Sequence, residues 1–104
     1  MLSYKYQSQV YSQIGNLAKL ELALQKLVAL SPNVPEPRFD LARLEATRGE
    51  TDQAMKDLAI SINLSSERLK TIPTARDLLA EARRDANLNS LRSLPAFHKL
   101  VPTN

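Results

Sequence analysis

The chain has 104 residues, of which 43% are hydrophobic and 24% charged, and 14 basic against 11 acidic residues leave a formal net charge of +3. These values are typical of one globular domain with a modest core and exclude a multidomain enzyme, a disordered tail or a polycation. The absence of cysteine excludes disulfides, thiolate metal sites and a cysteine nucleophile. With His98 as the single histidine, we expect no catalytic site, no cofactor and no metal.

The N-terminal sequence lacks an apolar stretch behind a basic start, so it does not resemble a secretory signal. The longest uncharged stretches, 27–35 and 58–66, are far shorter than the roughly 20 residues that a transmembrane helix needs. We therefore expect a soluble segment without a membrane span. A lack of cysteine is compatible with reducing and oxidising compartments, so cytoplasm and periplasm both remain open.

Leucine and alanine recur at steps of three and four residues, which predicts helices and no strand. The predicted helices span about 3–14, 17–30, 35–48, 51–64 and 73–84. Gly15 and Gly49 are expected to end the first and third, and Pro35 and Pro37 to form the first turn of the third. The helix over 17–30 is apolar on most sides, which predicts that it is well buried.

Less regular structure is expected in the C-terminal third. The run Leu64-Ser65-Ser66 is expected to end the fourth helix, with an inserted helical turn within 65–71, and Thr71 to precede a fifth helix beginning at Pro73. Because Pro95 would break a long helix, residues 87–102 are predicted to form two short helical turns. We expect their apolar side chains to cover the end of the core: Leu88, Leu91, Leu94, Phe97 and Leu100.

The two glycines, Gly15 and Gly49, lie 34 residues apart, and the same shift relates Leu24 to Leu58. A fixed helix-turn-helix period is a signature of solenoid proteins. The stretch 35–64 resembles the tetratricopeptide repeat (TPR) family, whose pattern it meets at Leu41, Ala42, Gly49, Ala54, Leu58 and Ser61. The stretch 1–32 meets the pattern at Tyr4, Ser8, Tyr11, Gly15, Leu24 and Pro32.

The sequence departs from the family at four positions. Arg38 and Glu45 stand where the family prefers aromatics, and Leu20 and Leu27 stand where it prefers small residues. The resemblance nevertheless implies an all-α, right-handed solenoid, similar to the C-terminal repeats and cap of a bacterial TPR protein. In this scheme 1–34 is the first repeat, 35–68 the second, and 69–104 a degenerate third repeat with a C-terminal cap.

The TPR resemblance implies a non-catalytic scaffold that binds a protein or peptide in the groove formed by the first helix of each repeat. By resemblance, six residues line this groove: Lys5, Gln9, Ser12, Phe39, Arg43 and Ala46. Family members that bind chaperones grip a terminal carboxylate with a lysine and asparagines. Lys5 matches that lysine, but Gln9 and Asp40 replace asparagines, and an aspartate would repel a carboxylate. That subclass is disfavoured.

Three other interpretations stay open. The chain could serve only as the structural cap of a larger enzyme or membrane-associated protein. It could self-associate through its N-terminal helix, for which the sequence offers no cap. Nucleic-acid or anionic-surface binding is less favoured, because the C-terminal basic residues form no aromatic-lined stripe: they are Arg68, Lys70, Arg76, Arg83, Arg84 and Arg92. Asp77, Glu81 and Asp85 are expected on a solvated helix face with weak ion pairs.

Overall fold

The computed structural model describes residues 17–102, and every regular element in this part is helical. Its first helix covers residues 17–30, here called helix 17–30. The later elements are α2 (Pro35–Thr47), α3 (Thr51–Thr71), α4 (Leu78–Arg84), the 3-10 helix η1 (Ala86–Leu91) and α5 (Pro95–Leu100). The all-α prediction is confirmed for these residues, whereas the predicted helix 3–14 lies outside them.

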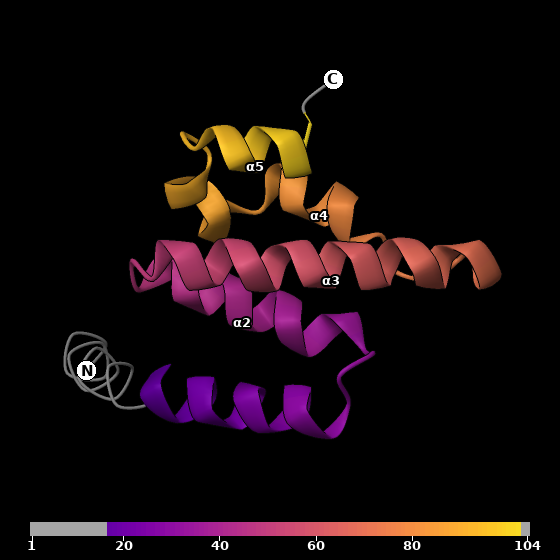
Figure 1. Ribbon diagram of the computed structural model, residues 1–104, viewed down its shortest axis with the longest axis horizontal. Helices are drawn as coiled ribbons and strands as arrows, with labels where there is room; N and C mark the ends of the chain where they lie inside the picture. The colour runs from indigo at the N-terminus through magenta and orange to yellow at the C-terminus, as the bar shows by residue number, and fades with distance from the viewer. Residues whose placement is uncertain (1–16, 103–104) are drawn as a thin grey trace, which may run out of the picture.

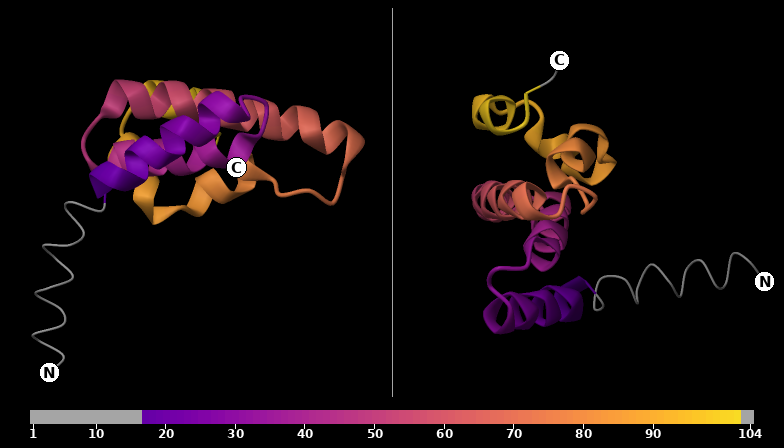
Figure 2. Two further views of the ribbon diagram at one scale, coloured as in Figure 1. Left: turned by 90° about the horizontal axis from the view of Figure 1, so that it is seen from below. Right: turned by 90° about the vertical axis from the view of Figure 1, so that its right-hand side faces the viewer.

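The helices lie in successive layers (Figure 1). Helix 17–30 is at one side, followed by α2, then α3, and then the short elements α4, η1 and α5. A perpendicular view shows the same order (Figure 2). None of the helices described is long and apolar enough to cross a membrane.

The ends of α2 follow from the residues that the sequence places there. Pro35 and Pro37 occupy its first turn, where their missing N–H groups cost no helical hydrogen bond. At the other end Gly49 adopts a positive φ of 79°. The N–H of Glu50 then donates to the carbonyl of Glu45, 2.8 Å away, and closes the helix end. Both predicted boundaries of this helix are therefore confirmed to within a residue.

The helix α3 is longer than predicted, because it continues for 21 residues through Ser65 and Ser66 to Thr71. Ser65 is buried, and its hydroxyl donates to the carbonyl of Arg76 at 3.1 Å. The same hydroxyl accepts the N–H of Leu78, also at 3.1 Å. The expected break at this serine pair is wrong because Ser65 bonds across to the next segment instead of competing for its own helix backbone.

The predicted fifth helix begins later and is shorter than expected. Residues 72–77 form a turn that contains Pro73, and α4 starts only at Leu78. Its N-cap is Asp77, whose side chain accepts the N–H of Ala80 at 3.2 Å, rather than Thr71. Leu78 and Ala82 are fully buried in the core.

The main core lies between α2, α3 and the C-terminal elements. Phe39 comes from α2, Leu58 from α3 and Phe97 from α5, and all three are almost fully buried. The two short helical segments that Pro95 predicts are present, as η1 and α5. The five predicted side chains of this segment, together with Val101, complete this core or pack against it: Leu88, Leu91, Leu94, Phe97 and Leu100.

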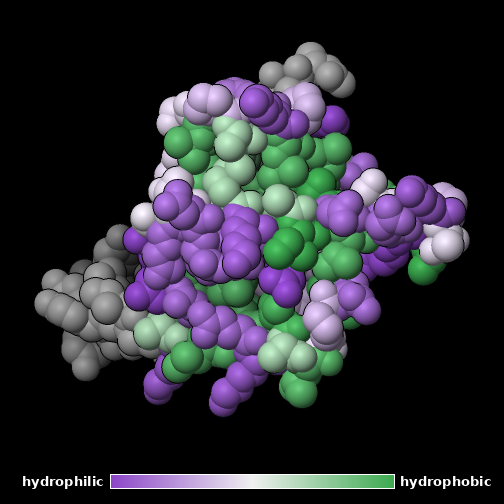
Figure 3. Space-filling model, in the orientation of Figure 1, coloured by the Kyte–Doolittle hydropathy of each residue, from purple (hydrophilic) through white to green (hydrophobic). Residues whose placement is uncertain are grey.

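Helix 17–30 contacts the rest of the protein through a much smaller cluster. Leu24 is its one buried leucine and packs with Leu41 and Leu44 of α2. Four other leucines of this helix are exposed: Leu20, Leu22, Leu27 and Leu30. The expectation of a well-buried helix is therefore wrong, because a single stripe of the helix meets α2. Hydrophobic residues accordingly interrupt the polar surface along this edge (Figure 3).

Candidate functional site

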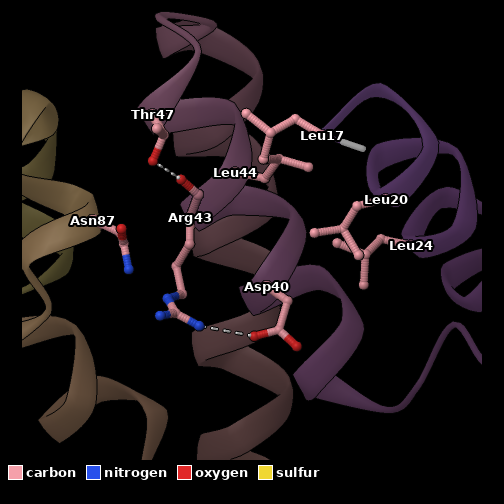
Figure 4. A pocket seen from close by; sticks show the side chains of 8 residues that line it. All are labelled: Leu17, Leu20, Leu24, Asp40, Arg43, Leu44, Thr47 and Asn87. Atoms are coloured by element: carbon pink, nitrogen blue, oxygen red, sulfur yellow. Dashed lines mark hydrogen bonds and ion pairs between the residues drawn. The ribbon is translucent and has the colours of Figure 1, made fainter. Parts of the chain in front are cut away.

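Two hollows flank α2, one on each side of its contact with helix 17–30. The first, here called the apolar hollow, has a volume of about 330 Å³. Helix 17–30 supplies one wall, η1 supplies the other, and α2 forms the floor (Figure 4). Its lining is mostly aliphatic on one wall and polar on the other: Leu17, Leu20, Leu24, Asp40, Arg43, Leu44, Thr47 and Asn87.

Arg43 is the central charged residue of the apolar hollow. Its Nη1 lies 3.3 Å from Asp40 Oδ1, and its Nε lies 2.7 Å from Asp85 Oδ2. Asp85 in turn caps η1 by accepting the N–H of Asn87 at 2.9 Å. Arg43 thus joins α2 to the junction between α4 and η1.

A network of ion pairs lies between α2, the end of α3 and the turn before α4. Both guanidinium nitrogens of Arg68 pair with the Glu36 carboxylate, at 2.9 and 2.6 Å. Arg76 pairs in the same bidentate way with Glu81, at 2.9 and 2.7 Å. The hydrogen bonds from Arg68 and from Arg76 lower the pKa of Glu36 and of Glu81 respectively. Charges in this network are therefore mutually neutralised.

The structure describes some of the groove residues that the TPR resemblance implies. Arg43 does face a hollow, but Phe39 and Ala46 are 1% and 2% exposed and belong to the core. The open face of α2 is instead displaced by one position, to Asp40 and Thr47. Gly49 is a turn residue, as predicted. The remaining predicted residues lie outside the described part of the chain: Lys5, Gln9, Ser12 and Gly15.

The three C-terminal carboxylates do not share one helix face. Asp77 caps α4, Glu81 pairs with Arg76, and Asp85 caps η1 and pairs with Arg43. The contacts of Asp77 and Glu81 lie at the exposed surface, as expected, whereas Asp85 departs from the expectation because it joins the end of α4 to α2. His98 is exposed and contacts the edge of Phe97, away from both hollows.

The second hollow, here called the polar hollow, lies on the other side of α2, between helix 17–30 and α3. Its volume is about 490 Å³. Four carboxylates and one arginine dominate its lining, which comprises Glu21, Gln25, Val28, Arg38, Leu41, Glu45, Glu50, Gln53 and Asp57. Arg38 and Glu45 are two of the positions at which the sequence departs from the TPR pattern.

The carboxyl groups of Glu45 and Asp57 are both buried and lie close together in the polar hollow. Asp57 has partners, since Arg38 Nη1 lies 3.3 Å from Oδ1 and Gln53 Nε2 lies 3.4 Å from Oδ2. Glu45 is 2% exposed, and its Oε1 has no hydrogen-bond partner. Burial is the largest cause that raises the pKa of Glu45, and together with the neighbouring Asp57 carboxyl it raises this pKa to about 8.

Sequence reasoning missed the polar hollow, although a signal for it exists. Arg38 and Glu45 are seven residues apart, and Gln53 and Asp57 are four apart, spacings that put each pair on one helix face. Of these four residues, the family pattern marks only Arg38 and Glu45 as exceptional and gives no reason to pair them with α3. The signal becomes visible when the two faces are placed against each other.

Neither hollow has the ligands of a metal centre. No group of three or more histidine, cysteine or carboxylate residues is placed to hold a metal ion within residues 17–102. Comparisons of the chain with protein-family models, with curated proteins and with solved structures find no match. The geometry of the two hollows therefore carries the functional argument.

Proposed function

We propose that the chain is a TPR-like, non-catalytic module that binds a protein or peptide segment in the apolar hollow. The observation that carries this proposal is the composition of that hollow: Leu17, Leu20 and Leu44 offer apolar contact. Asp40 and Thr47 stand beside them with polar side chains. Protein ligand sites combine an apolar lining with a few polar groups in this way and fall in the same range of volumes, about 300–1,000 Å³.

Exposure of the leucines further supports this proposal. Leu20 lines the apolar hollow and is 47% exposed, so a partner that covers it removes apolar surface from water. Because Asp40 and Asp85 outnumber Arg43 by one charge, a neutral or weakly basic segment fits this hollow better than an acidic one.

The experiment compares two leucines of one helix. Leu20→Asp places a charge in the apolar hollow, whereas the control Leu22→Asp changes a residue that is 60% exposed and lines neither hollow. Affinity capture followed by mass spectrometry should recover a partner with the wild type and Leu22→Asp, and lose it with Leu20→Asp. Circular dichroism checks that all three proteins are folded. Equal capture by both variants would contradict the proposal.

A purely structural role is the second candidate, in which the chain caps the solenoid of a larger protein. The burial of Leu88, Leu91 and Phe97 by short elements favours it, since capping requires a segment that closes a core. Absence of any partner that depends on Leu20 would select this candidate.

Nucleic-acid binding through the C-terminal arginines gains no support from their contacts. Arg68 and Arg76 are paired with glutamates. Arg92 donates to the carbonyls of Ala82 and Asp85 at 3.2 and 2.7 Å. Cations held in this way are poorly placed to contact phosphates.

A further inference from the structure

The polar hollow contains a buried acid that lacks a compensating cation. Glu45 lines the hollow, its side chain is almost fully buried, and its Oε1 accepts no hydrogen bond. Buried polar atoms nearly always have partners, because leaving one unpaired in a low-dielectric interior is costly. An unpaired carboxyl oxygen that lines a cavity is open to a donor that enters the cavity.

The charges that face Glu45 come from each of the elements around it. Asp57 lies on α3, Glu21 on helix 17–30, and Glu50 in the turn after α2. Arg38, the one cation among the described residues that line the hollow, pairs with Asp57 through Nη1 and leaves its own buried Nε without a partner. Glu21 Oε1 lies 3.2 Å from Arg48 Nη1. The acids near Glu45 all raise its pKa, so the local field favours a positive charge at this point.

The shape of the hollow indicates which kind of cation fits. Val28 and Leu41 provide apolar surface near the carboxylates, and the cavity of about 490 Å³ is large enough for several heavy atoms. An aliphatic stem can lie along apolar side chains while its charged head meets a carboxylate, as lysine and arginine side chains do. The described residues place no metal-ligand cluster here, so an organic cation fits better than a metal ion.

We propose that the polar hollow binds an alkylammonium or alkylguanidinium group, with its N–H donors on Glu45 and its stem against Val28 and Leu41. A basic side chain of a protein partner and a free polyamine both carry such a group. Two carboxyls that meet without a donor between them can bond only by sharing a proton. Binding of the cation replaces that proton, which is released to the solvent, and the charge of the site is balanced in both states.

Isothermal titration of the full chain with propylammonium and propylguanidinium tests this proposal. We expect saturable binding of the cations and none of the neutral isostere N-propylacetamide. Because one proton leaves for each cation bound, the affinity should rise up to about tenfold per pH unit between pH 6 and 8. Equal binding of the neutral isostere, or an affinity independent of pH, would overturn the proposal.

A variant pair locates the binding. Glu45→Gln keeps the shape of the side chain but removes its charge, and should weaken cation binding by about tenfold to a hundredfold. The control Glu67→Gln changes an exposed acid that pairs with Lys70, and should bind as the wild type does. Unchanged affinity in a folded Glu45→Gln protein would overturn the proposal.

Two further arms separate the sources and the sites. Binding of a lysine- or arginine-containing peptide more tightly than spermidine identifies a protein side chain as the occupant, and the reverse order identifies a polyamine. The polar hollow is separate from the apolar hollow in which a protein partner is proposed to bind, since Leu20 does not line the polar hollow. Leu20→Asp should therefore retain cation binding, so failure of one proposal is distinguishable from failure of the other.

Discussion

The apolar and polar hollows share helix 17–30 and α2 but differ in how their charges are matched. On the apolar side, Arg43 contacts both Asp40 and Asp85. On the polar side, Glu45 is buried with an unpaired oxygen next to Asp57. The difference shows that a helix between two layers can present two distinct chemical surfaces, one whose charged groups are paired and one that buries an acid without a basic partner.

The acids of the molecule divide in the same way. Glu36 and Glu81 have lowered pKa values because arginines bond to their ionised forms. Glu45 has a raised pKa because burial and neighbouring acids disfavour its ionised form. Ionisation therefore stabilises the fold at the first two positions and destabilises it at the third.

The largest expected effect comes from removing the contact between helix 17–30 and α2, which lies between the two hollows. Leu24→Ala should lower the free energy of unfolding by about 3 kcal/mol, because Leu24 is the buried leucine that joins helix 17–30 to Leu41 and Leu44. Urea denaturation measures this change. Leu22→Ala, at an exposed position of the same helix, should change stability by less than about 0.5 kcal/mol. Similar small losses in both variants would show that helix 17–30 is not anchored by Leu24.

The next effect is a pH dependence that belongs to the polar hollow. Folded Glu45 keeps its proton up to about pH 8, whereas the unfolded chain releases it near pH 4.5. Stability should therefore fall as pH rises through this window, by about 1.4 kcal/mol per pH unit from this group alone. Glu45→Gln should remove this slope, and Glu67→Gln should keep it. Urea denaturation from pH 5 to 8 measures both, and equal slopes in the two variants would contradict this assignment.

A smaller effect on stability is expected from the ion pairs between Arg68 and Glu36 and between Arg76 and Glu81. Arg68→Lys should cost about 1 kcal/mol, because an ammonium cannot reproduce the two parallel bonds to Glu36. Since the pKa of folded Glu36 is lowered, this cost is present above pH 4.5 and disappears as pH falls through the folded value. The exposed pair of Lys70 and Glu67 provides the control. Lys70→Arg should leave the midpoint of thermal unfolding unchanged. A cost that persists in strong acid would contradict the ion-pair explanation.

Much of the helical architecture could be predicted because its signals are local. Prolines at 35 and 37 and the positive φ of Gly49 set the ends of α2, and Pro95 divides the C-terminal segment. The length of α3 could not be predicted, because Ser65 continues the helix only by bonding to a distant segment, through Arg76 and Leu78.

The candidate site was harder to predict than the helices. A shift of one residue along α2 moves a side chain by about 100° around the axis, which exchanges the core residue Phe39 for the open residue Asp40. The polar hollow depends on three elements meeting, so no single helix shows it. Arg38 and Glu45 were visible as exceptions to a pattern, and only the packing of α3 gives them a shared partner in Asp57.

The titration of individual carboxyl groups tests the contrast between the two sides of α2 most directly. Carbon-13 NMR of the glutamate side-chain carboxyls, followed from pH 2 to 10, assigns a midpoint to each. We predict a midpoint near 8 for Glu45 and midpoints below 4.5 for Glu36 and Glu81. A midpoint for Glu45 at or below 4.5 would contradict the account, because the polar hollow would then hold no uncompensated acid.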